Sequence, residues 1–260
     1  MRKLVVLPVA LVAAAVVAAP AAAQVPETIF KSSAKISPKK AGTKKNPRGI
    51  QLTGSLGFET VTQGVEAPIV TGGDVLIAKG GVWNGGKYAK CSKRTMDRNQ
   101  SVDECPAKSI VGAGSGVAFA DTVNAAPDVV FVNGGKKMLW AFTTLYNPAL
   151  VREPVPIRIK KTRGKWAYRA SFRIPKVLQV VAGVPVTLRS FKYKIGGKVK
   201  LPYRVNGKRA IINVKRSAPK LLATTSCPRN NKYAYKATAF YLYNTGAKDS
   251  DTYKGKVACR

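Results

Sequence analysis

The chain has 260 residues, of which 45 are lysine or arginine and 12 are aspartate or glutamate, so its formal net charge is +33, and it contains no histidine. The absence of histidine excludes Ser-His-Asp and Cys-His catalysis and all histidine-ligated metal sites. A charge of this size attracts polyanions and raises solubility, but it carries no information about the fold.

Residues 1–23 have the pattern of a secretory signal peptide. Arg2 and Lys3 supply the charged start, residues 4–19 form an apolar run, and three alanines at 21–23 form a small-residue cleavage site. We therefore expect a secreted protein that is extracellular or loosely associated with the cell envelope. Removing these residues leaves 43 basic and 12 acidic residues, a net charge of +31. No later stretch predicts a membrane span.

Residues 37–48 form a basic loop rich in proline, glycine and lysine, which follows a short predicted strand at 28–36. Such a composition predicts a mobile segment without regular structure. It is either a solvated connector or an arm that binds a polyanion.

The four cysteines, Cys91, Cys105, Cys227 and Cys259, predict two disulfides, because an even number of cysteines in an exported chain indicates oxidised pairs. Three connectivities are possible. We favour Cys91–Cys105 with Cys227–Cys259, since each of these pairs closes a local loop. A thiolate zinc site needs close C-x-x-C pairs, which are missing. We expect no metal and no cofactor.

From residue 49 onward the pattern is typical of short strands, predicted first at 50–58, 74–83, 110–119 and 138–146, with a short helical turn near 92–97. Gly112, Gly114 and Gly116 share one parity of their strand and so lie on one face. A bare strip of this kind admits a neighbouring backbone or a large ring such as Trp83 or Trp140, or it lines a ligand groove. The strand at 138–146 is apolar on both parities, which indicates burial on both faces.

Residues 155–160 and 165–174 predict a hairpin. Pairing Lys160 with Lys165 places Ile159 opposite Trp166 and brings both apolar sets onto one face. In the strand at 184–195 the apolar phase changes at residues 189–190, which predicts a bulge or a bend.

A second hairpin is predicted at Asn206-Gly207, the strongest two-residue turn signal, with Val205 opposite Lys208 and Val199 opposite Val214. A last strand at 233–243 loops through 244–251 and returns along 252–259. The second disulfide would close this terminal hairpin.

These elements predict an all-β protein, an antiparallel β-sandwich of about a dozen short strands with two local disulfides. We favour a single sandwich domain over residues 24–260. The alternative is two lobes that meet near residues 148–154.

Several segments are shared features of a known group: the signal peptide, residues 37–48, Cys91-Ser92, residues 105–114 and the C-terminal aromatic strand closed by cysteine. In these the chain resembles uncharacterised secreted β-rich proteins of actinobacteria. The resemblance implies an exported β-rich fold. It supplies no activity, ligand or catalytic residue.

No catalytic residue is predicted, and we expect a protein that is not an enzyme. Two S-x-x-K matches, at 32–35 and 217–220, lie in extended or loop segments and lack the partner motifs of penicillin-binding enzymes. The 12 acidic residues leave a two-carboxylate hydrolase open, but no spacing selects a pair.

The strongest remaining signal is the cationic face of the predicted hairpins, where like charges oppose one another at a cost in stability. These lysines and arginines either protect strand edges or contact something anionic. We predict electrostatic association with anionic cell-wall or surface polymers. The polyanion-binding candidates are Arg158, Lys160, Lys165, Arg169, Arg173, Lys198, Lys200, Arg204 and Arg209.

The sequence contains no known nucleic-acid-recognition motif, so we predict no specific nucleic-acid partner. The sequence does not indicate an oligomeric state. The alternative function is a carbohydrate- or small-ligand-binding sandwich that uses exposed aromatic side chains, namely Trp83, Tyr88, Tyr235 and Tyr241. An apolar or aromatic-lined groove beside the glycine strip would favour this alternative.

Overall fold

The structure is a computed structural model that describes residues 28–61, 67–205 and 208–260, with the backbone alone for residues 203–205 and 208–210. The predicted signal peptide and the turn at Asn206-Gly207 lie outside the described residues.

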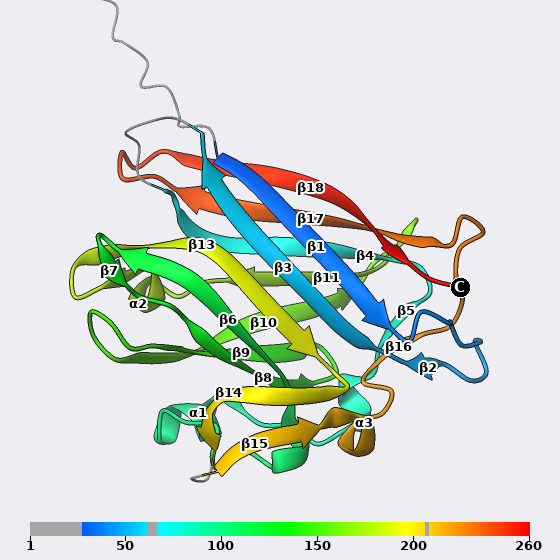
Figure 1. Cartoon of the computed structure of the whole chain (residues 1–260). Helices are drawn as coiled ribbons and strands as arrows, with labels where there is room; N and C mark the ends of the chain where they lie inside the picture. Colours follow the sequence, from blue (N-terminus) through cyan, green and yellow to red (C-terminus); the bar gives the residue numbers. More distant parts are fainter. Residues whose placement is uncertain (1–27, 62–66, 206–207) are drawn as a thin grey trace, which may run out of the picture.

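One antiparallel sheet of thirteen strands dominates the described chain, as the all-β antiparallel prediction requires. Its main path follows the order β1-β3-β13-β6-β8-β9-β10-β11-β4-β17-β18, and short strands β7 and β12 pair with β6 and β13. The sheet curls until β1 lies beside β18, so that it is nearly barrel-shaped (Figure 1). Two smaller sheets, β14-β15 and β2-β16-β5, lie at one end.

The strands are β1 (Thr28–Ser37), β2 (Arg48–Gly49), β3 (Gln51–Thr60), β4 (Ile69–Ala78), β5 (Gly81–Trp83), β6 (Ile110–Ala120), β7 (Val123–Asn124), β8 (Asp128–Gly135), β9 (Met138–Leu145), β10 (Val151–Lys161), β11 (Trp166–Arg173), β12 (Val180–Val181), β13 (Val184–Ile195), β14 (Lys198–Val205), β15 (Lys208–Asn213), β16 (Leu222–Thr224), β17 (Lys232–Leu242) and β18 (Lys248–Ala258). The helices are short: η1 (Gly85–Lys87), α1 (Lys93–Arg98), η2 (Ala107–Ser109), α2 (Lys176–Gln179) and α3 (Val214–Ser217). Among the described residues, no helix has the length and apolar character needed to cross a membrane.

Both predicted disulfides are present, Cys91–Cys105 and Cys227–Cys259. The first closes a loop that packs its buried Met96 and Val102 into the same apolar cluster as Val130 and Phe142. Val130 and Phe142 come from the outer faces of β8 and β9, respectively. The prediction that the strand at 138–146 is buried on both faces is therefore confirmed, because the disulfide loop covers the face that would otherwise meet water.

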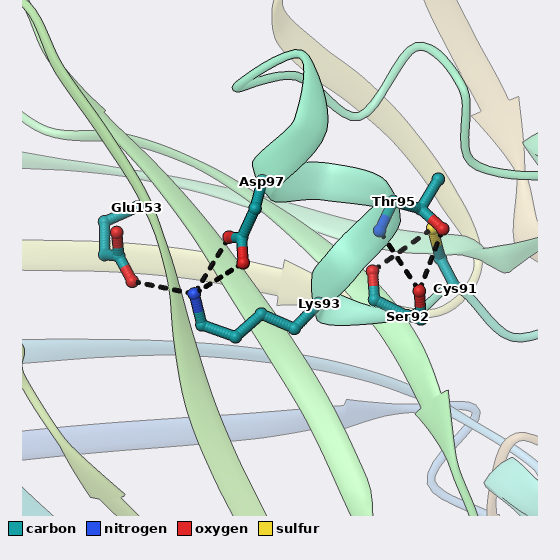
Figure 2. A network of polar contacts seen from close by, with 6 residues as sticks. All are labelled: Cys91, Ser92, Lys93, Thr95, Asp97 and Glu153. Carbon is teal, nitrogen blue, oxygen red and sulfur yellow. Dashed lines mark hydrogen bonds and ion pairs between the residues drawn. The ribbon is translucent and has the colours of Figure 1, made fainter.

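Polar contacts hold the 91–105 loop in place (Figure 2). The predicted helical turn is α1, whose N-cap Ser92 accepts a 3.1 Å hydrogen bond from the backbone N–H of Thr95. The ammonium group of Lys93 lies 2.8 Å from Asp97 in the same helix and 3.4 Å from Glu153 on β10. Lys93 thus ties the loop to the sheet beneath it.

The β10-β11 hairpin forms, but its register differs from the predicted one. Lys160 lies opposite Arg169 rather than Lys165, and Ile159 lies opposite Ala170 rather than Trp166. Strand β10 continues to Lys161, which leaves residues 162–165 as the connection. The shift is an even number of residues, so both apolar sets still share one face, as predicted.

The predicted bulge in β13 and the predicted pairing next to the β14-β15 turn are confirmed, whereas the pairing at the other end of β14 and the start of β18 differ from the prediction. The predicted bulge in β13 lies between Leu188 and Ser190. Val205 pairs with Lys208 as expected, but a register shift further out places Val199 opposite Ile212 instead of Val214, where α3 begins. In the terminal hairpin β18 starts at residue 248, four residues before the predicted return strand.

The basic loop at 37–48 has no regular structure for most of its length, yet it is anchored. The backbone N–H of Ala41 donates to the carbonyl of Arg260 at 2.8 Å, and that of Gly42 to the carbonyl of Thr224 at 3.2 Å. Its last residue, Arg48, belongs to β2, which pairs with β16. The loop is therefore held against the C-terminus.

We predict that removing either disulfide by a paired Cys→Ala change destabilises the fold without abolishing the sheet. The loops closed span 14 and 32 residues, so the chain-entropy model gives a loss of about 3 to 4 kcal/mol in each case. Urea unfolding followed by tryptophan fluorescence measures this loss. An unchanged midpoint for the variant without Cys91 and Cys105 would contradict the role assigned to the covering loop.

Candidate ligand-binding cavity

Side chains on the inside of the curled sheet line a cavity of about 400 Å³. Alternate side chains of the long strands point into it, as the period of two along a strand requires, for example Ile157 and Ile159 of β10 and Tyr168, Ala170 and Phe172 of β11. This volume lies within the range of small-molecule pockets in proteins.

Different elements lie at opposite ends of the curled sheet, β5 and β16 at one and α2 at the other (Figure 1), and each contributes side chains to the cavity lining. Val82 and Trp83 of β5 and Leu222 of β16 line one end, where the small β2-β16-β5 sheet lies. Leu178 of α2 lines the other end and is itself buried. The cavity thus extends along the interior of the sheet between these two ends.

The predicted glycine strip faces this interior. Gly112, Gly114 and Gly116 pair with residues 195, 193 and 191 of β13, whose side chains line the cavity. The strip accommodates the ring of Phe191, which occupies the space that a Cβ at Gly114 would need. Neither Trp83 nor Trp140 fills it. The strip is therefore a seat for a large ring, and the cavity lies beside it, lined by the residues of β13 that pair with the strip.

Three more aromatic rings lie against glycines of neighbouring strands in the same way. A Cβ at Gly54, Gly73 or Gly255 would overlap the ring of Tyr193, Phe172 or Tyr235, respectively. Each of these three rings lines the cavity. The glycines leave room for large apolar side chains without filling the interior.

Inward-facing side chains at the middle of the sheet remain partly accessible. Leu56, Val75, Ala170, Phe172 and Phe191 all face inward, yet none is fully buried. Protein cores normally pack to the density of organic crystals, and apolar side chains beside a void lose their dispersion contacts. The interior therefore has room for additional apolar atoms.

The lining that the structure describes contains no lysine, arginine, aspartate or glutamate. Most of its polar side-chain atoms bond to the protein itself. The Thr143 hydroxyl donates to the carbonyl of Ala141 at 3.2 Å, and the indole N–H of Trp83 donates to the carbonyl of Lys136 at 3.2 Å. The cavity is therefore apolar and uncharged, although the protein as a whole is strongly cationic.

Side chains close the seam between the first and last strands. The backbone N–H of Phe30 donates to the Asp251 carboxylate at 2.9 Å. The Tyr243 hydroxyl donates to the Thr28 hydroxyl, and the Tyr235 hydroxyl to the Ser32 carbonyl, each at 3.0 Å. Edge groups of β1 are thus bonded across the seam, which joins the two borders of the cavity wall.

The structure brings together four of the nine predicted polyanion-binding residues, on the outer face of β10 and β11: Arg158, Lys160, Arg169 and Arg173. The other five lie elsewhere. Lys165 is in the connection between the two strands, Lys198 and Lys200 are exposed on β14, and Arg204 pairs with Arg209 in the β14-β15 hairpin, with both side chains outside the described residues.

Two cations that the sequence analysis did not single out extend this face. Lys160 lies opposite Arg169, Arg169 and Lys236 both lie opposite Leu76, and Lys236 lies opposite Lys254. Four cations therefore form one cross-strand row over five strands, and we call Lys160, Arg169, Lys236 and Lys254 the basic row. Only the pairing of β4 with β11 and β17, which are distant in sequence, places them together.

One carboxylate lies under the basic row. Asp74 of β4 is buried and forms an ion pair with Arg169. Burial by itself would raise the pKa of Asp74, but hydrogen bonds from Arg169 and Ser171 outweigh it and lower the pKa below its usual value. Asp74 thus neutralises part of the like-charge repulsion in the row.

The four aromatic residues suggested as exposed ligand contacts are not exposed. Tyr241 is fully buried, and Trp83, Tyr88 and Tyr235 are half-buried. Trp83 and Tyr235 do line a cavity, but from the inside of the curled sheet. The expectation of a surface platform is wrong: Trp83 and Tyr235 face the interior, Tyr241 is in the core, and Tyr88, which follows η1, packs against the apolar cluster of the disulfide loop.

Among the described residues, no group of three or more histidine, cysteine, aspartate or glutamate side chains could hold a metal ion. Comparisons with protein-family models, with curated proteins and with solved structures found no match to this chain.

We predict that alkaline pH destabilises the native protein through Tyr193. Burial, followed by the neighbouring Tyr235, raises the pKa of Tyr193 to about 12, whereas an unfolded tyrosine ionises near 10. The stabilisation from the protonated hydroxyl is complete below about pH 10 and is lost as the pH rises toward 12, because unfolding then releases a proton.

Urea unfolding of the wild type and of Tyr193→Phe between about pH 9 and pH 12 tests this. The free energy of unfolding of the wild type should fall relative to the variant by about 1 to 3 kcal/mol across that range. A difference between the two proteins that does not change with pH would contradict the raised pKa.

Proposed function

We propose that the protein binds a small apolar molecule inside its curled sheet. The observation that carries this proposal is the cavity of about 400 Å³ with an uncharged, largely apolar lining beside the glycine strip. Such a cavity favours the small-ligand function over the polymer-binding one, because the interior is where the chain departs from ordinary close packing.

Apolar contact supplies the binding free energy in this proposal. Each square ångström of apolar surface that leaves water contributes roughly 25 cal/mol, and an enclosed pocket removes most of a small ligand's surface from water. The aromatic faces of Phe172, Phe191 and Tyr193 add flat contact surfaces. The part of the lining that the structure describes offers no carboxylate or amine that could act as a general acid or base, which supports binding rather than catalysis.

Filling the cavity should abolish binding of a neutral apolar probe. Ala170 faces the interior and is only half-buried, so an Ala170→Phe ring would occupy space now open to a ligand. We expect N-phenyl-1-naphthylamine to become fluorescent on binding the wild type, and its affinity to fall about tenfold or more in Ala170→Phe. Fluorescence titration measures both.

Ser115→Phe is the matched control. It adds the same ring to an exposed position on the outer face of β6, and it should leave the affinity for the probe unchanged. Equal loss in both variants, or equal binding by all three proteins, would mean that the probe does not occupy the cavity.

A second function, association with anionic cell-wall or surface polymers, is favoured by one specific observation, the basic row. Like charges placed in register across strands are destabilising unless an anion compensates them. Within this row the ion pair of Asp74 is with Arg169. The protein would work outside the membrane in this proposal. Its two disulfides support that setting, since such bonds persist in oxidising compartments.

The basic row can be tested by removing three of its charges together. We expect Lys160→Gln, Lys236→Gln and Lys254→Gln combined to weaken binding to poly(glycerol phosphate) about tenfold. Lys198→Gln, Lys200→Gln and Lys215→Gln combined remove the same charge from the β14 side and should have a much smaller effect. Affinity measured against salt concentration distinguishes them, because screening must release an electrostatic complex. Equal losses would assign binding to net charge rather than to this face.

A further inference from the structure

We infer that the ligand of the cavity is an uncharged molecule with a hydroxyl or carbonyl group, and that this group binds at a polar spot formed by Tyr193 and Ser32 on the inner wall. The inference rests on the proposed function and names the chemical class of ligand for that site.

The absence of charge in the described lining excludes a ligand whose charged group enters the cavity. A buried ion without a partner costs far more than apolar contact restores, so it is paired in proteins or does not enter. Cations on the described strands of the wall lie on its outer face, for example Lys160 and Arg169, whose strands present Ile159 and Ala170 to the interior. An acid or an amine would therefore meet no counter-ion inside.

Two tyrosines converge on β1 from opposite sides of the seam. Tyr193 of β13 lies across Gly54 of β3, and Tyr235 of β17 lies across Gly255 of β18. β3 and β18 are the two strands that flank β1. The glycines let both rings reach toward the first strand, which concentrates hydroxyl groups at one place on the wall.

The hydrogen-bonding capacity of this place is only partly used. The Tyr235 hydroxyl donates to the Ser32 carbonyl at 3.0 Å. The Ser32 side chain also interacts with Tyr235. Within the described part of the chain, the Tyr193 hydroxyl forms no hydrogen bond to the protein, and both Tyr193 and Ser32 line the cavity. An unpaired polar group in an apolar enclosure costs free energy that a ligand with a matching group restores.

The Tyr193 hydroxyl is protonated at physiological pH, as any tyrosine with a pKa of about 10 or above is, and burial raises its pKa further. It can therefore donate to a carbonyl oxygen or exchange hydrogen bonds with a hydroxyl. It supplies no charge. The ring faces of Phe172, Phe191 and Tyr193 along the wall suit a flat or extended apolar body attached to that group.

A matched series of pyrene probes tests the assignment. Pyrene, 1-pyrenemethanol, 1-pyrenecarboxylate and 1-pyrenemethylammonium share one ring system and differ in charge and hydrogen bonding. Titrations at high salt suppress binding to the outer cations. We expect 1-pyrenemethanol to bind most tightly, and both charged probes to bind at least about tenfold more weakly.

Tyr193→Phe separates a ligand contact from a packing role. It should weaken 1-pyrenemethanol about fivefold, the effect of one neutral hydrogen bond, and leave pyrene unaffected. Ser32→Ala gives a smaller loss in the same direction and serves if Tyr193→Phe folds poorly. Equal weakening of pyrene and 1-pyrenemethanol in these variants would overturn the polar spot.

The outcomes distinguish the two proposals. If 1-pyrenecarboxylate binds as tightly as 1-pyrenemethanol, and Ala170→Phe removes both, the cavity binds ligands but the assignment to an uncharged class is wrong. If Ala170→Phe leaves all four probes unaffected, the proposed function itself fails, and this inference fails with it.

Discussion

The packing of aromatic rings against glycines on the inner wall is the constraint on which the rest of this structure depends. A curled sheet of this size has more interior than ordinary side chains on its strands fill. At Gly54, Gly73, Gly114 and Gly255 the missing Cβ lets a ring from the next strand lie along the wall. The rings cover the backbone with apolar surface, yet they leave the centre open, and the cavity follows from that arrangement.

The outer face of the sheet is apolar in one region and cationic in another. Strands β8 and β9 are apolar on both faces, and the disulfide loop 91–105 covers the outer one with Met96 and Val102. Over the adjacent strands β10, β11, β4, β17 and β18 the outer face is cationic instead, with Asp74 as a buried counter-ion of Arg169. Charge and apolar space are therefore separated by one layer of backbone. A neutral ligand inside and an anionic partner outside are physically compatible with each other.

Much of the local structure could be predicted because it depends on neighbours in the sequence. The disulfides close local loops, Ser92 caps α1, and the phase change at residues 189–190 marks the bulge of β13. Strand β8 was not predicted: Val129–Val132 form a short apolar run without alternation, which periodicity does not identify. The register of β10 with β11 was wrong by an even shift, because alternation specifies which face a residue takes but not which residue lies opposite it.

The sequence by itself determined the β class, the facing of Gly112, Gly114 and Gly116 to one side and the excess of positive charge, and it favoured the cysteine pairing that forms. Only the tertiary structure decided that this side is the inside of a curled sheet, that Phe191 rather than a tryptophan occupies the strip, and that Lys160, Arg169, Lys236 and Lys254 align. The physical reason is that strand neighbours such as β6 with β13 and β4 with β17 are far apart in the chain. Their pairing depends on how the whole sheet curls until β1 meets β18, and no local pattern records that curvature.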